Sequence, residues 1–202
     1  MTNGRRRWLR GGVAWAIVAM VPPAKVLHAA GATSEAAIIA EMIPGGTVLL
    51  LRHAATVPGV GDPPGFRLGD CATQRNLSEA GRESARTFGA RLAAAGVRFG
   101  PVLSSGWCRC LDTATLAFGR AERWPPLDSF FDDRRDEPAR TAAVRARIAA
   151  WRGPGTLVLV THMVIIAAIA GESTAMGEAL VLAPGRPSRI SADFTVVGRL
   201  SV

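Results

Sequence analysis

Two short apolar runs stand out from the alternating hydrophobic and polar positions of the chain. Residues 47–51 read Thr-Val-Leu-Leu-Leu, and residues 156–160 read Thr-Leu-Val-Leu-Val. Continuous runs of this length and composition are typical of strands that are buried on both faces of a sheet. The first run leads through Arg52 to His53, and the second leads through Thr161 to His162. Because open α/β sheets bind ligands at the carboxyl ends of their strands, we expect both histidines at a ligand site.

Amphipathic or apolar segments of helical length lie between and around these runs. Helices are predicted at residues 34–43 (with Ser34 as the cap), 78–95, 108–118, 139–151 and 163–170. Further short strands are predicted at residues 101–105, 180–182 and 190–197. Strands that alternate with helices predict a three-layer α/β/α fold with a mainly parallel central sheet.

Two stretches carry no periodic pattern. Residues 54–76 are rich in Gly and Pro and predict a long loop, and loops of this length in compact domains are usually functional. Residues 120–138 are irregular, acidic and aromatic.

The N-terminal pattern differs from the rest of the chain. A basic stretch at residues 5–10 precedes an apolar stretch at 11–21, and small residues follow at 29–32. This order is typical of a secretory signal, and the apolar stretch is short for a membrane span. The basic stretch also resembles a twin-arginine signal, with a Sec signal or an uncleaved anchor as alternatives. We therefore expect an export signal at residues 1–32, a single domain at 33–202, and a periplasmic or otherwise exported protein.

Composition and charge limit the possible functions. The 202 residues are 49% hydrophobic and 20% charged, which is typical of a globular domain. Five positive charges of the net +8 fall in residues 1–32, and the remainder carries 19 arginines against 16 acidic residues. Outside residues 1–32, no basic run with interleaved aromatic residues is present, so we expect no nucleic-acid partner. Since His28 lies in the predicted signal, the folded domain would hold only His53 and His162.

The chemistry of these residues favours an anion site. Arg52 and Arg109 with an imidazole would bind a phosphoryl group, and Arg109 lies in the first turn of a predicted helix. One histidine beside a bound phosphate could act as a nucleophile. A metal site needs further ligands at definite spacing, and neither His53 nor His162 lies in such an arrangement. We expect no metal and no cofactor.

Several motifs together resemble the histidine phosphatase superfamily, which has the phosphoglycerate-mutase-like fold. The resemblance covers about residues 46–171. The motifs are Leu51-Arg-His-Ala-Ala-Thr56, Arg75-Asn-Leu-Ser-Glu-Ala-Gly-Arg82, Leu103-Ser-Ser105 before Arg109, Asp112-Thr-Ala114, and Val160-Thr-His162.

The resemblance implies a role for each matching residue. His53 would be the nucleophile that accepts the phosphoryl group, and Arg52, Arg109 and His162 would bind its oxygens. Thr56 matches the threonine of the first motif and is a further candidate hydrogen-bond donor. Arg75 is an additional basic candidate, with an ion pair at the start of the following helix as the alternative.

The chain also departs from the motifs of that superfamily. Ala55 stands where an acidic residue is usual, and Met163 and Ile165 make the segment after His162 apolar. A general acid is also required to protonate the leaving oxygen. The superfamily often supplies it between Arg109 and His162, where the candidates are Asp128, Asp132, Asp136 and Glu137. Asp132 is favoured, with a solvated loop carboxylate as the alternative for each.

Three cysteines leave two alternatives open. An exported protein can form disulfides, and one bridge from Cys71 to Cys108 or Cys110 would tie the long loop to the helix of Arg109. Three reduced thiols are the other alternative.

The leading hypothesis is an exported phosphatase that hydrolyses a small phosphomonoester, or a phosphorylated envelope sugar, through a phosphohistidine. We expect no stable membrane span after signal removal. The alternative is a non-catalytic module that binds phosphate or a polyanion through a degenerate phosphatase site.

Overall fold

A six-stranded mixed sheet organises the chain. The computed structural model describes residue 1, residues 33–189 and residues 191–202, so nearly all of the predicted signal lies outside the described residues. The strands are β1 (Val48–Arg52), β2 (Phe99–Ser104), β3 (Glu122–Arg123), β4 (Thr156–Thr161), β5 (Glu178–Pro184) and β6 (Phe194–Ser201). The helices are α1 (Glu35–Met42), α2 (Glu79–Ala94), α3 (Cys108–Phe118), α4 (Glu137–Ala149) and α5 (Met163–Ala170), with short 3₁₀ turns η1 (Cys71–Thr73) and η2 (Pro125–Leu127).

The order of the strands explains how the two histidines meet. The sheet runs β3-β2-β4-β1-β5-β6, with the first four strands parallel, β5 antiparallel to β1, and β6 antiparallel to β5. In the pairing of β1 with β4, Arg52 lies opposite Thr161. His53 and His162 follow these two residues directly, so the register of the strands places both histidines at the same edge of the sheet.

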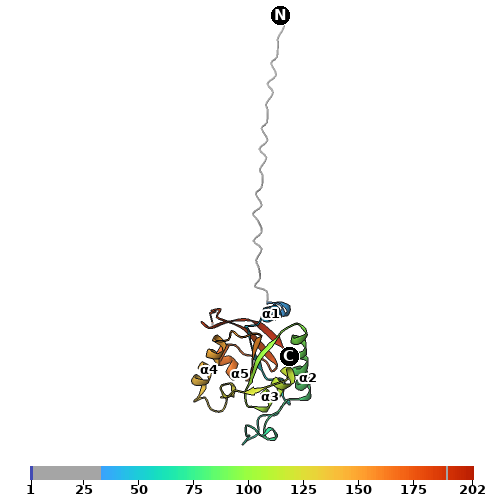
Figure 1. Ribbon diagram of the computed structural model, residues 1–202, viewed down its shortest axis with the longest axis vertical. Helices are drawn as coiled ribbons and strands as arrows, with labels where there is room; N and C mark the ends of the chain where they lie inside the picture. The colour runs from blue at the N-terminus through green and yellow to red at the C-terminus, as the bar shows by residue number, and fades with distance from the viewer. Residues whose placement is uncertain (2–32, 190) are drawn as a thin grey trace. The chain divides into compact units, whose positions relative to one another are not determined.

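Helices cover both faces of the sheet, as the sequence predicted. Leu49 and Leu51 of β1 pack into a core beneath α1, α2 and α3, and the alternate residues Val48 and Leu50 pack into a second core beneath α4 and α5. All four side chains are fully buried. Figure 1 shows α2 and the pair α4 and α5 on opposite sides of the strands. The three-layer α/β/α prediction is therefore confirmed.

Close packing fixes the start of α2 against the segment after β1. The Ser78 hydroxyl caps α2 by accepting a hydrogen bond from the Gly81 amide at 3.0 Å, and the Ser78 amide donates to the Ala55 carbonyl at 3.0 Å. A Cβ on Gly81 would lie 2.0 Å from that carbonyl oxygen, so only glycine permits this approach.

Several boundaries differ from the prediction, and strands β2, β5 and β6 each extend beyond the predicted residues 101–105, 180–182 and 190–197. Helix α4 begins at Glu137, ahead of the predicted residue 139, because Pro138 is tolerated in a first helical turn, and it ends before Trp151. Strand β6 begins at Phe194 because Asp193 closes a turn, in which its carbonyl accepts from the Gly185 amide at 2.8 Å. Residue 190, the predicted start of that strand, lies outside the described residues. The two-residue β3 lies within the segment that was predicted to be irregular.

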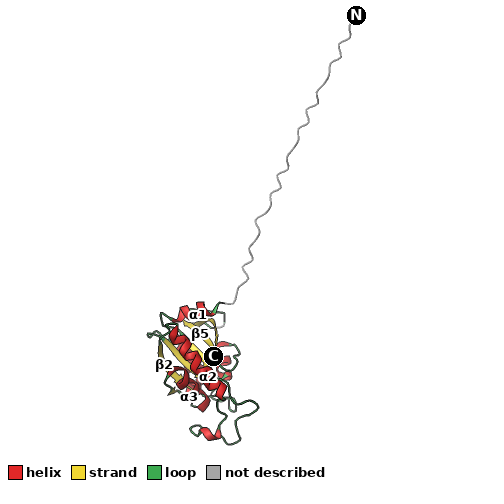
Figure 2. Cartoon of the chain, turned by 90° about the vertical axis from the view of Figure 1, so that its right-hand side faces the viewer, coloured by secondary structure: helices red, strands yellow, loops and turns green. Residues whose placement is uncertain are grey.

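The loop of residues 54–76 extends from the body of the domain and carries η1 (Figure 2). A disulfide joins Cys71 to Cys108, the first residue of α3. Of the two alternatives for the cysteines, the structure therefore has the bridged one, and Cys110 is buried and free. Within the described part of the chain, no helix has the length and apolar character that a membrane span requires.

Candidate active site

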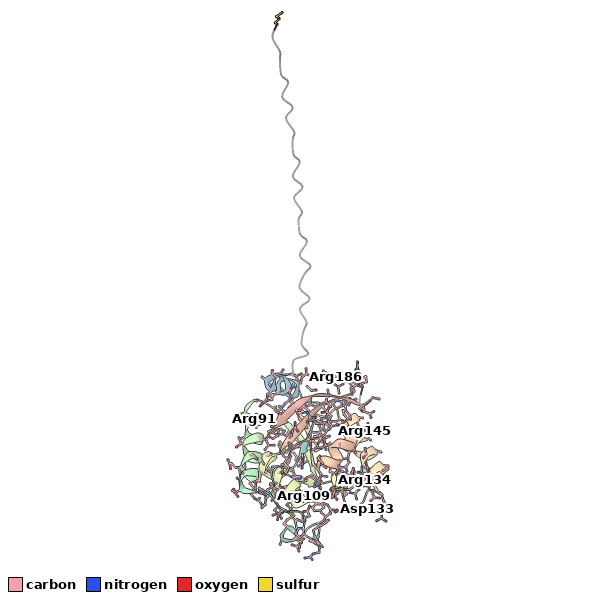
Figure 3. All side chains as sticks on the ribbon, turned by 180° about the vertical axis from the view of Figure 1, so that it is seen from behind. Arg91, Arg109, Asp133, Arg134, Arg145 and Arg186 are labelled. Carbon is pink, nitrogen blue, oxygen red and sulfur yellow. A yellow bond between two sulfur atoms is a disulfide. The ribbon has the colours of Figure 1, made fainter. Side chains whose placement is uncertain are left out.

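One cavity of about 510 Å³ brings together six of the seven residues that the sequence singled out. His53 and Arg52 reach it from the end of β1, and His162 reaches it from the end of β4. The wall also contains Arg109, Arg75 and Asp132. In Figure 3, Arg109 lies in the lower part of the domain, as do Asp133 and Arg134, whereas Arg186 lies at the top.

The backbone and its hydrogen bonds fix the orientation of His53. The side chain is 2% exposed, and its Nδ1 lies 2.9 Å from the Ala54 carbonyl oxygen. A carbonyl only accepts, so Nδ1 carries the proton and Nε2 keeps a free lone pair. Burial and, to a lesser extent, Arg109, Arg52 and Arg75 together lower the pKa of His53 to about 3, against the opposing effect of the Ala54 hydrogen bond. The ring is therefore neutral at neutral pH, which is the state that a nucleophile needs.

His162 is held by a buried chain of hydrogen bonds. Its Nε2 lies 2.9 Å from the Ser105 hydroxyl, which donates to Oδ1 of Asp128 at 3.1 Å. Because the hydroxyl has one proton, it accepts from Nε2–H, and the free lone pair of neutral His162 lies on Nδ1. Burial, together with Arg109 and His53, holds the pKa of His162 well below its usual range. The two rings are 5.5 Å apart, edge to face.

Three arginines supply the positive charge of the cavity. The Nε atoms of Arg52, Arg75 and Arg109 are buried, and none has a hydrogen-bond partner among the described residues. The protein therefore leaves part of the donor capacity of these three guanidinium groups unused, and all three side chains line the cavity. Burial, with Arg75 and Arg109, lowers the pKa of Arg52. Arg52 is anchored by a bond from Nη1 to the Thr174 carbonyl at 2.6 Å.

Asp62 is a cavity residue that the sequence analysis missed. Its Oδ1 accepts from Nη1 of Arg109 at 2.9 Å and from the amide of Arg75 at 3.0 Å. A carboxylate thus lies directly against the group that would bind a phosphate. No motif or spacing marks one aspartate in a Gly- and Pro-rich loop, and the only available signal was the prediction that this loop is functional.

Of the four carboxylates proposed as the general acid, only Asp132 lines the cavity, where it is exposed. Both oxygens of Asp128 are engaged, Oδ1 by Ser105 and the Gly106 amide and Oδ2 by Arg123 at 3.3 Å. Asp136 pairs with Arg140 at 3.4 Å, and Glu137 pairs with Arg134 at 2.6 Å. Asp128 therefore positions other groups, and Asp132 and Asp62 are the two candidates at the cavity.

Two other predicted positions differ from expectation. Thr56 does not line the cavity, because its side chain is buried and its hydroxyl donates to Sδ of Met176 at 3.5 Å. Ile165 is buried in the core, so the apolar cavity residues after His162 are Met163 and Val164. Arg75 makes no ion pair within the described residues and faces the cavity instead of bridging to the start of α2.

Cys110 contributes packing beside His162. Its Sγ lies 3.5 Å from Nε2 of His162, and burial raises the pKa of the thiol to about 12. The thiol is therefore protonated at neutral pH. Across residues 33–189 and 191–202, no three His, Cys, Asp or Glu side chains converge in a way that could hold a metal ion.

No family model and no curated protein matches the sequence. Among solved structures, the chain is similar to the protein histidine phosphatase SixA in complex with tungstate, with a TM-score of 0.53 and 16% identity over 77% of this chain and 96% of that one. It is also similar to a candidate phosphohistidine phosphatase SixA from Agrobacterium tumefaciens, with a TM-score of 0.50 and 22% identity over 78% and 99%.

A third similar structure is the mycobacterial glucosyl-3-phosphoglycerate phosphatase, with a TM-score of 0.53 and 17% identity over 75% of this chain and 97% of that one. All three proteins belong to the histidine phosphatase superfamily. The chain therefore has the phosphoglycerate-mutase-like fold of that superfamily, as its sequence motifs predicted.

Proposed function

We propose that the protein is an exported phosphatase that hydrolyses a phosphomonoester in two steps, with His53 as the nucleophile. The observation that carries this proposal is a neutral, buried imidazole with a free Nε2 beside three guanidinium groups whose Nε atoms lack acceptors. Phosphoryl transfer requires two parts, a neutral nucleophile and a cationic clamp for the phosphate, which here consists of the three guanidinium groups. The fold shared with histidine phosphatases supports the same conclusion.

In the first step, Nε2 of His53 attacks phosphorus. A P–N bond forms while the P–O bond to the alcohol breaks, and the alcohol oxygen takes a proton from a carboxylic acid. In the second step, water attacks phosphorus, its proton returns to the same carboxylate, and the P–N bond breaks. The products are the alcohol and inorganic phosphate, and His53 returns to its neutral form.

His162 and the arginines stabilise the transferring group. The guanidinium groups of Arg52, Arg75 and Arg109 would donate to phosphoryl oxygens and offset their charge. A bound phosphate dianion would also favour protonation of His162 at Nδ1, because the positively charged ring attracts the dianion. The chain from Nε2 through Ser105 to Asp128 stabilises that charged ring.

We assign the general acid to Asp62 in preference to Asp132. Asp62 already accepts a hydrogen bond from Arg109, so a phosphate bound to that arginine would lie beside it. A second anion at this distance favours the protonated carboxyl, which is the form that donates a proton. Asp132 lines the same cavity but is exposed.

Export is proposed on two grounds. Residues 1–32 follow the order of a charged, an apolar and a small-residue segment, and disulfides such as Cys71–Cys108 persist in oxidising compartments. Replacing Arg5 and Arg6 together by lysine should retain the protein in the cytoplasm if the route is twin-arginine. Unchanged export of that variant would leave the Sec route.

A panel of phosphomonoesters tests the proposed activity. The purified protein should release inorganic phosphate from at least one ester, and the His53→Ala variant should release none. The alternative, a non-catalytic phosphate-binding module, draws on Ala55 in place of the usual acidic residue. Binding of phosphate without turnover of any ester would favour that module over the phosphatase.

A further inference from the structure

The cavity is larger than a phosphoryl group requires. Its volume of about 510 Å³ falls in the range of sites that enclose a whole small molecule, roughly 300–1,000 Å³. The deepest lining residues are His53, His162 and Arg109, which are at most 5% exposed. Nearer the mouth, six apolar residues form what we call the apolar wall: Pro63, Pro64, Phe66, Phe131, Met163 and Val164. The space above the phosphate clamp is therefore bounded by hydrocarbon.

Part of the apolar wall is left in water. Phe131 is 76% exposed and Met163 is 39% exposed, although both border the cavity. Large apolar side chains that remain exposed beside a concave polar centre are typical of a ligand surface. Covering them with a hydrocarbon group would remove apolar area from water on both partners.

The loop side of the wall is held in a fixed position relative to the clamp. The ring of Phe66 packs against Trp107 at 4.4 Å between centroids, and the guanidinium of Arg109 lies 4.3 Å above the same indole. The disulfide Cys71–Cys108 ties the loop to α3. A wall ordered before binding loses little conformational entropy when a ligand arrives.

The remaining polar groups of the cavity restrict the ligand further. Besides the histidines and arginines, the polar groups that line the cavity are the side chains of Asp62, Ser129 and Asp132 and the indole N–H of Trp107. Asp132, the lining carboxylate that is not assigned as the proton donor, would repel a second anionic group on the substrate. A sugar would bring several hydroxyls into a space with few partners, and each hydroxyl buried without a hydrogen bond is unfavourable.

We infer that the substrate is a phosphomonoester of an apolar alcohol that carries no second anionic group, with its hydrocarbon part on the apolar wall. This inference rests on the proposed function and narrows its substrate class. It favours alkyl and aryl esters over phosphorylated sugars, including the envelope sugars considered from the sequence.

Two six-carbon esters of primary alcohols test the inference. The purified protein should hydrolyse n-hexyl phosphate with a kcat/KM at least about tenfold above that for glucose 6-phosphate, the scale on which hydrophobic pockets discriminate. Phe131→Ala and Met163→Ala should each lower kcat/KM for hexyl phosphate several-fold more than they lower kcat/KM for glucose 6-phosphate. Ile43→Ala is the matched control, because Ile43 is also exposed, at 43%, but caps α1 and does not line the cavity.

Equal or better hydrolysis of glucose 6-phosphate would overturn the inference, as would Phe131 and Met163 variants that behave like the Ile43 control. If neither ester is hydrolysed, the binding of n-hexylphosphonate and methylphosphonate decides the question by calorimetry. Tighter binding of the hexyl compound, weakened by Phe131→Ala, would support the apolar substrate while the phosphatase proposal fails. Equal affinities would overturn the inference itself.

Discussion

His53 and His162 reach the cavity from the ends of two paired strands, whereas Asp62 and Arg75 reach it from the loop of residues 54–76. The strand side is positioned by sheet register and by burial of all but a few per cent of each ring. The loop side depends on individual links, chiefly the disulfide Cys71–Cys108 and the ion pair of Asp62 with Arg109.

This difference separates two kinds of contribution. The strand side, in which we include Arg109 because α3 packs directly on the sheet, provides the nucleophile and most of the positive charge around it. The loop side provides the acid, one arginine and part of the apolar wall, and a few bonds hold it in place. Changes on the strand side should therefore remove the chemistry, and changes on the loop side should weaken binding or proton transfer.

The largest effect is expected at the clamp. Arg109→Ala should lower kcat/KM by about 10³–10⁵, the range for removing an arginine that stabilises a transferring phosphoryl group. Arg75→Ala should lower it far less, because Arg75 is partly exposed and belongs to the loop. Steady-state kinetics measures both, with Arg91→Ala as the control, since Arg91 pairs with Glu35 outside the cavity. Equal losses for Arg109 and Arg75 would contradict the division into two sides.

The next effect concerns proton transfer. Asp62→Asn should lower kcat for an alkyl phosphate by about 10²–10⁴, the usual contribution of a general acid. The loss should be much smaller for p-nitrophenyl phosphate, whose leaving group needs no proton. Asp133→Asn, at an exposed ion pair with Arg135, should change neither rate. If Asp132→Asn gives the split between substrates and Asp62→Asn does not, the acid is Asp132.

Breaking the disulfide should act mainly on stability. Its two cysteines are 37 residues apart, and opening a loop of that length should lower the free energy of unfolding by about 3–4 kcal/mol in the chain-entropy model. KM should rise more than kcat falls, because the loop loses its tie to α3. Denaturant unfolding with and without reductant measures the change, and the Cys71→Ser/Cys108→Ser double variant should not respond to reductant. Three titratable thiols in the denatured, unreduced protein would rule out the bridge.

The smallest effect is a change in protonation on the strand side. Nuclear magnetic resonance of the two histidine rings of the domain should show neither titrating near its usual pKa of 6.5, because burial lowers both values. Added inorganic phosphate should raise the pKa of His162. For stability, the unfolded state binds more protons than the folded state between pH 6.5 and about 3. The free energy of unfolding should therefore fall as the pH falls through that window. A ring of His53 that titrates near 6.5 in the folded protein would contradict the neutral nucleophile.

The strand side could be predicted from the sequence because its signals are local. A run of Val and Leu that leads to His53 or His162 predicts a buried strand and also places the histidine at the carboxyl end of that strand. The resemblance made Arg75 and Asp132 candidates for the site, and the structure places both on the lining of the cavity. Only the register that sets Arg52 opposite Thr161 required the structure.

The loop side could not be predicted in the same way. Asp62 meets Arg109 across 47 positions of chain, and that contact depends on how the whole loop folds. The hydrogen bonds from His162 through Ser105 to Asp128 likewise join three segments that no periodic pattern connects. Thr56 matched a motif, yet its buried hydroxyl donates to Sδ of Met176, a contact between residues 120 positions apart that the motif does not reveal.

The most direct test of the account is to trap the phosphoryl group on the protein. Incubation with a labelled phosphomonoester followed by an alkaline quench should leave label on one residue, stable in alkali and lost in acid, as phosphohistidine is. Mass spectrometry should place it on His53, and His53→Ala should lose both label and turnover, whereas His162→Ala should turn over more slowly and still accept some label. Label on any other residue, or full turnover by His53→Ala, would contradict the proposed mechanism.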